Sequence, residues 1–298
     1  MKQKFIEKMQ ITFEVTPSAP KESPGDVLFS TYGNEWLSVK KQTTKPSTYA
    51  EYERIFKLNL EPQFGHLKLS QITRPMVQKF LFKYVEEEKF RTAEKLKLQL
   101  TCIFDMAADE FNLISPMKKI VLPYHQAKKG SALTKEEELR LIEYCRKKKD
   151  DVSSALLVLL YFGLRQSELA SIRIIDNKYL ECETSKVRLG RNRLFRKIPI
   201  TPVAKRIVSL IDFEAAKNVN LVKLKSAFRR FMPSHHPHEL RYTFITRCKE
   251  AGVNPEVVML WDGHTQDSDA RTSKVDRGYT DYSEEYLLAE AEKVNYSL

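Results

Sequence analysis

The sequence predicts a mainly helical protein that also contains one small antiparallel β-sheet. Amphipathic helical patterns fill most of the chain between residues 26 and 128. A stretch near residue 180 changes to the two-residue alternation of β-strands, and helical patterns return from about residue 202 to the end. Together these observations favour a helical domain followed by a mixed α/β domain.

The first predicted domain is a small bundle of four helices that spans residues 26–128. Residues 1–25 end in the turn-rich stretch TPSAPKESPGD, and we expect them to form a flexible N-terminal segment. The stretch VLFSTYGNEWLSVKK then has the spacing of an amphipathic helix. Its apolar stripe consists of Leu28, Phe29, Tyr32, Trp36 and Leu37.

The second predicted domain spans residues 129–298, and its boundary with the first lies within a linker-like segment over residues 114–138. Thr134 and Glu137 have the spacing of a capping box, which predicts the start of a helix. The apolar run ALLVLLYFGL is too short to cross a bilayer and predicts a buried helix. The stretches KYLECETSK and RLFRKIPI alternate around a glycine-containing turn, as two antiparallel strands would.

The charge of the chain favours a polyanionic partner. Its 298 residues include 50 Lys and Arg against 39 Asp and Glu, a formal net charge of +11, and the isoelectric point is near 9.3. The excess is spread along the chain and is not confined to a tail. Nucleic acid and an anionic membrane surface are the two partners that such a charge suggests.

The cysteines and the N-terminus indicate a cytoplasmic protein. The four cysteines lie far apart without CxxC spacing, so neither a zinc ribbon nor a disulfide framework is expected. We expect them to be buried reduced thiols. The first fifteen residues carry charges throughout and lack the apolar core of a signal peptide.

Two motifs in the second domain place arginines where packing alone would not require them. In YFGLRQSELASIR, Arg165 directly follows the apolar run, and Glu168 lies one helical turn further on. In HHPHELRYTF, His238 and Arg241 are three residues apart and would share one face of a helix. Each motif alone is compatible with an ordinary surface ion pair or a solvated helix face.

Two further motifs lie nearer the C-terminus. In LWDGHTQD, His264 follows a glycine at an apparent helix end, where the turn would expose and orient the imidazole. The stretch GYTDYSEEYLL then carries three tyrosines, Tyr279, Tyr282 and Tyr286. Tyrosines at such a position either pack a last helix or supply a nucleophile.

The histidines also allow a metal site as an alternative. His235, His236 and His238 cluster in sequence, and His264 could join them. A metal hydrolase would in addition need convergent carboxylates and open coordination positions. The nearby acidic residues form no recognised ligand motif, so this alternative is the weaker one.

The order of these motifs resembles the tyrosine recombinase (phage integrase) family. GLRQSELASIR is similar to the first-arginine box of that family, and HELRYTFITRCKEAGV is similar to its His-x-x-Arg box. LWDGH resembles the Gly-His element, and YTDYSEEYLLAEA resembles the tyrosine box. The resemblance implies a helical core-binding domain followed by the mixed α/β catalytic domain of that family.

The resemblance also implies the catalytic residues. The activating residues would be Arg165, Lys186, His238, Arg241 and His264, and Lys186 is chosen because the family lysine lies on the first hairpin strand shortly before its turn. The nucleophile would be Tyr279, with Tyr282 as the second choice. The family reaction needs no metal, ATP or redox cofactor.

These residue types suit the cleavage of a phosphodiester by a tyrosine. Guanidinium forks such as Arg165 and Arg241 can bind the non-bridging oxygens and stabilise the charge of the transition state. An ammonium beside them has a depressed pKa, so Lys186 suits protonation of the leaving 5′ oxygen. His238 can act as the base for Tyr279. His264 would hold a phosphate oxygen or position the tyrosine.

The resemblance implies a site-specific DNA recombinase that integrates or excises a phage or another mobile element. Its partners would be double-stranded DNA attachment sites, a tetramer of the same chain with exchange of the C-terminal helix, and an excisionase or a DNA-bending protein. Two alternatives remain open. One is a Xer-type chromosome resolvase, and the other is a DNA-binding regulator that has lost catalysis on the same scaffold.

Overall fold

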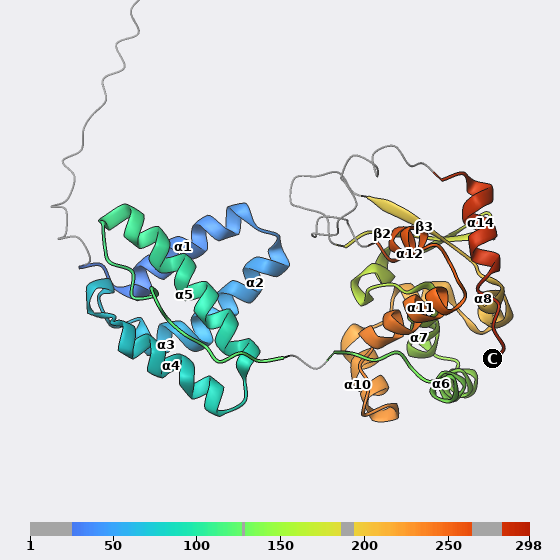
Figure 1. Ribbon diagram of the computed structural model, residues 1–298, viewed down its shortest axis with the longest axis horizontal. Helices are drawn as coiled ribbons and strands as arrows, with labels where there is room; N and C mark the ends of the chain where they lie inside the picture. Colours follow the sequence, from blue (N-terminus) through green and yellow to red (C-terminus); the bar gives the residue numbers. More distant parts are fainter. Residues whose placement is uncertain (1–25, 127–128, 186–193, 264–281) are drawn as a thin grey trace, which may run out of the picture. The chain divides into compact units, whose positions relative to one another are not determined.

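The computed structural model describes residues 26–126, 129–185, 194–263 and 282–298. The chain divides into two compact units, Met1–Gln126 and Ala127–Leu298. The fold is mainly helical, and its described residues include one three-stranded antiparallel sheet, so the predicted fold class is confirmed (Figure 1). Of the helices in the described ranges, none is long and apolar enough to cross a membrane.

The first unit is helical. Its elements are α1 (Phe29–Thr43), α2 (Pro46–Ile55), a π-helical turn (Phe56–Leu60), α3 (Glu61–Phe64), a 3₁₀ turn (Leu69–Gln71), α4 (Arg74–Glu86) and α5 (Phe90–Phe111). The predicted stripe of α1 is buried at Phe29, Tyr32, Trp36 and Leu37. Leu28 differs, because it lies in extended backbone just before the helix and its side chain is 41% exposed.

Aromatic rings hold the helices of the first unit together. The ring of Phe29 stacks on Phe56 at a centroid distance of 5.8 Å, and it also contacts Phe64 and Phe104. A Cβ atom at Gly33 would lie 2.2 Å from the ring of Phe56. The π-helical turn therefore packs directly on the backbone of α1, which only glycine permits at this position.

Part of the predicted linker is packed structure. Met117 and Ile120 are buried in the core of the first unit. The amide of Gln78 on α4 donates to the carbonyl of Val121 at 2.7 Å and accepts from its N–H at 3.1 Å. Lys97 on α5 donates to the carbonyl of Ile120 at 2.8 Å. Helical periodicity could not indicate this segment, because it packs in an irregular conformation.

The second unit combines helices with the sheet. Its helices are α6 (Lys135–Lys148), α7 (Asp151–Phe162), α8 (Pro202–Ile207), α9 (Phe213–Lys217), α10 (Leu221–Phe231), α11 (His238–Glu250), α12 (Pro255–Asp262) and α14 (Glu284–Glu292). The strands are β1 (Arg173–Ile175), β2 (Tyr179–Glu183) and β3 (Phe195–Pro199), in the order β1-β2-β3. Two 3₁₀ turns cover Gln166–Ser171 and Val208–Leu210.

Helix α7 is the centre of the second unit. Every residue from 152 to 162 is buried, and α6, α9, α10 and α11 pack around the helix. The run ALLVLLYFGL thus forms the buried helix that the sequence predicts. Gly163 ends α7 with a φ of +61°, and a Cβ atom there would lie 2.3 Å from the ring of Phe244 on α11.

The sheet contains the two predicted strands and one that the sequence did not indicate. β2 pairs with β3 in antiparallel register, with Tyr179 opposite Pro199. β1 is only three residues long, too short for its alternation to stand out, and it pairs with β2. α12 and α14 both pack against β3 (Figure 1). The capping box of Thr134 and Glu137 forms at the start of α6 as predicted.

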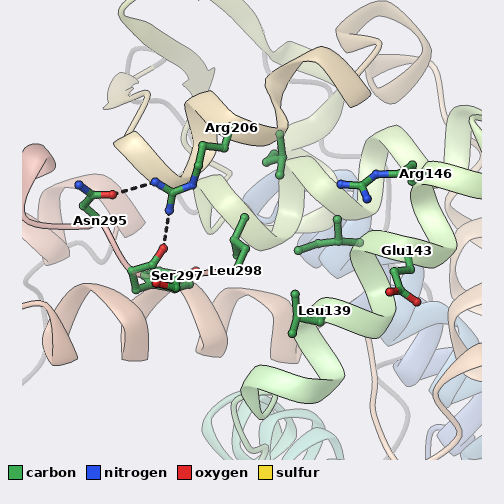
Figure 2. Close-up of a pocket in the computed structure, with 10 residues that line it drawn as sticks. Leu139, Glu143, Arg146, Arg206, Asn295, Ser297 and Leu298 are labelled. Carbon is green, nitrogen blue, oxygen red and sulfur yellow. Dashed lines mark hydrogen bonds between the residues drawn. The ribbon is translucent and has the colours of Figure 1, made fainter.

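The C-terminal segment lies against α6 and α8. Figure 2 shows the guanidinium of Arg206 donating to the side chain of Asn295 at 2.8 Å and to the backbone carbonyl of Tyr296. Leu298 and Leu139 line the same pocket, whose volume is about 580 Å³. The last residues therefore form one wall of this groove, and α6 and α8 form the rest.

A buried carboxylate anchors this segment. Glu138 on α6 accepts hydrogen bonds from the hydroxyls of Tyr296 at 2.6 Å and Tyr161 at 2.9 Å. Its other oxygen accepts from Arg247 on α11 at 3.1 Å. Arg247 also pairs with the exposed Glu250 at 2.9 Å. Glu138 therefore joins three helices and the C-terminal segment through one charge.

We predict that Glu138→Gln lowers the free energy of unfolding by about 3 kcal/mol, because it leaves a buried guanidinium with a neutral partner. The side-chain amide of glutamine would also place N–H donors next to Tyr161, Tyr296 and Arg247, which already donate to this position. Urea denaturation measures the loss. Glu250→Gln removes the exposed partner of the same arginine and should cost less than about 1 kcal/mol. Equal losses in the two variants would contradict the role given to Glu138.

Candidate active site

Arg165 is positioned by the end of α7. The helix stops at Gly163, Leu164 is buried, and Arg165 starts the 3₁₀ turn in extended backbone. The carboxylate of Glu168 accepts from the backbone N–H of Arg165 at 2.8 Å and from its Nη1 at 3.0 Å. The predicted pairing of these two residues is therefore present, although it forms on a 3₁₀ turn.

Arg241 reaches the same place from α11. Its side chain is 3% exposed, its Nη1 donates to the carbonyl of Gly163 at 2.7 Å, and its Nη2 lies 3.5 Å from Asp262. Burial, followed by the charge of Arg165, lowers the pKa of Arg241 to about 10. The guanidinium remains a cation at neutral pH, and its environment favours any anion that would share the site.

The end of α12 closes the cluster. Arg165 Nη2 donates to the carbonyl of Gly263 at 3.3 Å, and Asp262 precedes that glycine. Gly263 has a φ of +64°, and a Cβ atom there would lie 2.9 Å from Nη1 of Arg196. The glycine of the LWDGH motif thus allows two arginines to approach the helix end closely.

Arg196 on β3 is a member of this cluster that the sequence analysis missed. Its Nη2 donates to Glu168 at 2.6 Å. Burial alone would raise the pKa of Glu168, but the hydrogen bond from Arg196 and the nearby charges lower it to about 2. The signal in the sequence is that residues 196, 198 and 200 share the apolar face of an alternating strand. A charged residue on that buried face predicts a buried partner of opposite charge.

His238 is the first residue of α11, one turn before Arg241. It is exposed, and its ring meets Tyr242 edge-on at 5.4 Å. Tyr242 is 41% exposed, so the two rings form part of the surface beside the arginine cluster. The described geometry places the histidine and the arginine of the His-x-x-Arg motif on one helix at the spacing of a single turn.

Three predicted site residues, Lys186, His264 and Tyr279, lie outside the described residues. Their described neighbours still meet the cluster. Ser185 donates to Glu168 from its backbone N–H at 3.2 Å and from its hydroxyl at 3.0 Å. Gly263 accepts from Arg165. The last described residues before positions 186 and 264 therefore belong to the arginine cluster.

Tyr282, the second choice for the nucleophile, contacts a different part of α12. Its hydroxyl donates to Glu256 at 2.6 Å, and its ring stacks on Tyr286 at 5.1 Å. The hydrogen bond to Glu256 raises the pKa of Tyr282. Glu256 precedes Asp262 by six residues, a rise of about 9 Å along a helix. This contact holds the hydroxyl at the opposite end of α12 from the arginines.

The histidine cluster forms an ion-pair bridge at His235. Its Nδ1 lies 2.8 Å from Glu239 and its Nε2 lies 3.1 Å from Glu137, so the ring joins the first turns of α11 and α6. Burial would lower the pKa of His235, but the two carboxylates raise it above the usual value. Within the ranges that the structure describes, no group of three or more His, Cys, Asp or Glu side chains could hold a metal ion.

Comparisons with known proteins agree with the fold. Residues 28–84 match the family model described as the phage integrase N-terminal SAM-like domain. The tyrosine recombinase of Thermosipho africanus is 29% identical in an alignment 168 positions long, which covers 51% of this chain and 59% of that protein. Tyrosine recombinase XerA of Pyrococcus furiosus is 29% identical in an alignment 185 positions long, which covers 55% of this chain and 62% of that protein.

Solved structures share the architecture of both units. A lambda integrase tetramer bound to a Holliday junction has a TM-score of 0.70 at 17% identity, covering 90% of this chain and 86% of that one. The chain is therefore similar in sequence to tyrosine recombinases and similar in fold to integrases. The Tn1549 transposon integrase in complex with circular intermediate DNA has a TM-score of 0.63 at 18% identity, covering 89% of this chain and 99% of that one. The sequence matches span about three fifths of the curated relatives, 59% and 62% in the two cases above.

We predict that His235 makes the stability of the second unit depend on pH. Because its pKa is raised in the folded protein, the stabilisation is complete below the unfolded pKa of about 6.5 and is lost as the pH rises through the folded pKa. His235→Gln should therefore cost about 1 to 2 kcal/mol at pH 6 and progressively less toward pH 9.

Urea denaturation of wild type and variant across this pH range measures the difference. His66→Gln, at an exposed histidine of the other unit, controls for the loss of an imidazole. A cost that stays constant from pH 6 to pH 9 would show that His235 contributes by packing and not by charge.

Proposed function

We propose that this chain is a site-specific DNA recombinase that cleaves and rejoins DNA through a covalent 3′-phosphotyrosine. The observation that carries the proposal is the meeting of Arg165 and Arg241 at the ends of α7 and α12. Three of the motifs that define the family resemblance thus come together from distant parts of the sequence. Recombination of a phage or another mobile element is the reaction that the integrase-like fold supports best.

The arginines are the proposed phosphate-binding groups. Arg165 is 12% exposed and Arg241 3% exposed, so they have little access to water. Electrostatic attraction to a phosphate is stronger in such a site than in bulk solvent. Burial and, second to it, the charge of Arg165 lower the pKa of Arg241, and a bound phosphate oxygen would offset the repulsion between the two cations.

In the proposed cleavage step, the hydroxyl oxygen of Tyr279 attacks the scissile phosphorus as the bond to the 5′ oxygen breaks. His238 accepts the proton of the tyrosine, and Lys186 donates a proton to the leaving oxygen. His264 holds a phosphate oxygen or positions the tyrosine. Rejoining reverses these transfers and needs no ATP, because the aryl phosphate ester retains the energy of the broken bond. The scheme involves no metal or redox cofactor.

Tyr279 is preferred to Tyr282 for a structural reason. The hydroxyl of Tyr282 is bound to Glu256 at the start of α12, about 9 Å along the helix from Asp262. The same carboxylate raises the pKa of Tyr282, which opposes formation of a phenolate.

The two units receive different proposed roles. The helical unit, residues 26–128, would be a core-type DNA-binding domain, in keeping with the family-model match at residues 28–84. Residues 129–298 would form the catalytic domain. Both would bind DNA largely through attraction of basic side chains to the phosphates of the DNA backbone, as the net charge of +11 suggests. We further propose that the protein acts in the cytoplasm with an excisionase or a DNA-bending protein as an accessory partner.

A Xer-type chromosome resolvase is the second candidate function. It is favoured by relatives named tyrosine recombinase XerA and tyrosine recombinase XerD, which are 29% and 28% identical to the chain. Both functions share the chemistry and differ in their DNA sites. Mapping the cleaved sites in the source genome separates them, because a resolvase acts at one chromosomal site and an integrase at the two junctions of a mobile element.

We expect wild-type protein to form a covalent protein–DNA species on a nicked suicide substrate that carries its attachment-site core. Tyr279→Phe should abolish this species, because phenylalanine has no nucleophilic oxygen, whereas Tyr282→Phe should retain it. Denaturing gel electrophoresis of labelled DNA measures the product. Loss with Tyr282→Phe alone would reassign the nucleophile, and a wild-type protein that binds the site without cleaving it would be a regulator.

We also propose that the C-terminal segment is exchanged between protomers of a tetramer on paired DNA sites. In the isolated chain it lines its own groove together with α6 and α8, and Arg206 binds it there (Figure 2). Glu138 also accepts a hydrogen bond from Tyr296 of this segment. The same groove on a neighbouring protomer would offer identical contacts.

Replacement of Leu298 with the photo-reactive benzoylphenylalanine tests this exchange, because residue 298 lines the groove together with α6. Irradiation without DNA should give only intrachain crosslinks. Irradiation with paired sites should add a crosslinked dimer on a denaturing gel. A sample that assembles on DNA yet gives no dimer would exclude the exchange.

A further inference from the structure

The buried side chain of Arg196 connects three elements of the second unit. It is 8% exposed, and each of its three nitrogens donates to the protein. Nη2 donates to Glu168 at 2.6 Å, Nε to the carbonyl of Trp261 at 2.8 Å, and Nη1 to the hydroxyl of Thr184 at 3.3 Å. One guanidinium on β3 thus touches the 3₁₀ turn, the end of β2 and the end of α12.

Each of these contacts lies next to a proposed catalytic position. Glu168 holds Arg165 and also binds Ser185, which directly precedes Lys186. Thr184 lies one residue earlier, and its N–H donates to the carbonyl of Leu194 at 2.8 Å. Trp261 lies three residues before His264. Arg196 therefore connects described residues that are at or near three of the proposed catalytic positions in the sequence.

We propose that Arg196 is a positioning residue for DNA cleavage, which it serves by fixing Glu168 and the backbone on either side of the arginine cluster. This inference rests on the recombinase function proposed above and adds a residue to its machinery. Arg196 itself does not contact DNA in this proposal, because all three of its nitrogens are already bound to protein groups.

Charge balance supplies the physical reason. Among the described residues, the cluster contains three guanidiniums (Arg165, Arg196 and Arg241) and two carboxylates (Glu168 and Asp262). Without Arg196, the negative charge of Glu168 would be neutralised by Arg165 alone. Arg165 would then form a balanced ion pair and attract a phosphate less. Arg196 offsets the carboxylate and leaves the charge of Arg165 available to the substrate.

Geometry adds a second reason why a simple cation would not suffice. A lysine at position 196 would retain the charge, but its single nitrogen could not span Glu168, Thr184 and the carbonyl of Trp261 in the way the planar fork does. The absence of a side chain at Gly263 leaves room for this fork, since a Cβ atom there would lie 2.9 Å from Nη1. The site is therefore built for arginine at this position.

The test compares Arg196→Met and Arg196→Lys with wild type in single-turnover cleavage of the suicide substrate at saturating protein. We expect Arg196→Met to lower the cleavage rate about 10- to 100-fold, as is typical when a supporting residue is removed, while the affinity for the site changes little. Arg196→Lys should restore part of the rate.

Arg173→Met is the matched control. It removes another arginine–glutamate pair from the same sheet, with Glu181, but the arginine is 61% exposed and lies outside the cluster. We expect Arg173→Met to cleave the suicide substrate at the wild-type rate. If both Arg196 variants cleave at the wild-type rate, or if both lose activity only in proportion to their unfolded fraction, the positioning role is wrong.

An independent measurement separates this proposal from the proposed function. The backbone N–H groups of Arg165 and Ser185 both donate to Glu168, so their hydrogen exchange in DNA-free protein should accelerate in Arg196→Met. Unchanged exchange would overturn the positioning role even if cleavage falls. Failure of wild-type protein to form the covalent species would instead overturn the recombinase function, whatever the exchange rates show.

Discussion

The buried carboxylate of Glu168 is the interaction on which the candidate site depends. Its two oxygens accept five hydrogen bonds, from Arg165, Ser185 and Arg196, and its side chain has no exposed surface. A buried charge is tolerated only when it is paired and hydrogen-bonded, because desolvation otherwise costs several kcal/mol. The folded state therefore requires these donors to be in place, and their placement fixes the described backbone at residues 165 and 185.

The same cluster uses the C-terminal ends of two helices. α7 ends at Gly163, whose carbonyl accepts from Arg241, and α12 ends at Gly263, whose carbonyl accepts from Arg165. The carbonyl of Trp261 near that end accepts from Arg196. Helix C-termini carry partial negative charge and stabilise cations, so the helix ends help to hold like charges together. Repulsion among these cations is thereby kept low enough for folding, while their positive field remains directed at the site.

How much of this architecture the sequence predicted depends on how far apart in the sequence the interacting residues lie. Local signals worked where the contacts are local: the stripe of α1, the capping box of α6, the apolar α7, and the two longer strands. β1 was missed because three residues carry too little alternation. The packed segment around Met117 and Ile120 was missed because irregular backbone leaves no period, even where it is buried.

For the candidate site, the sequence indicated motifs but not their connections. The pairing of Arg165 with Glu168 is three residues apart and could be read directly. The contact of Arg196 with Glu168 spans 28 residues, and that of Arg241 with Gly163 spans 78, so no local pattern reports them. His235 illustrates the opposite case. Neighbouring histidines suggested a ligand cluster, yet the distant Glu137 gives this ring a structural ion pair.

The anchoring of the C-terminal segment has a thermodynamic consequence for assembly. If neighbouring protomers trade their segments, the bonds to Glu138 and Arg206 that break within one chain are replaced by the same bonds in another. The contact energies then cancel, and the balance depends on the entropy of joining chains and on the shape of the connecting residues. Free protomers in dilute solution would keep their own segments, because a tether holds each one near its groove at millimolar effective concentration. A scaffold such as DNA could hold several protomers at a similarly high local concentration. The segment could then bind a neighbouring protomer as readily as its own chain.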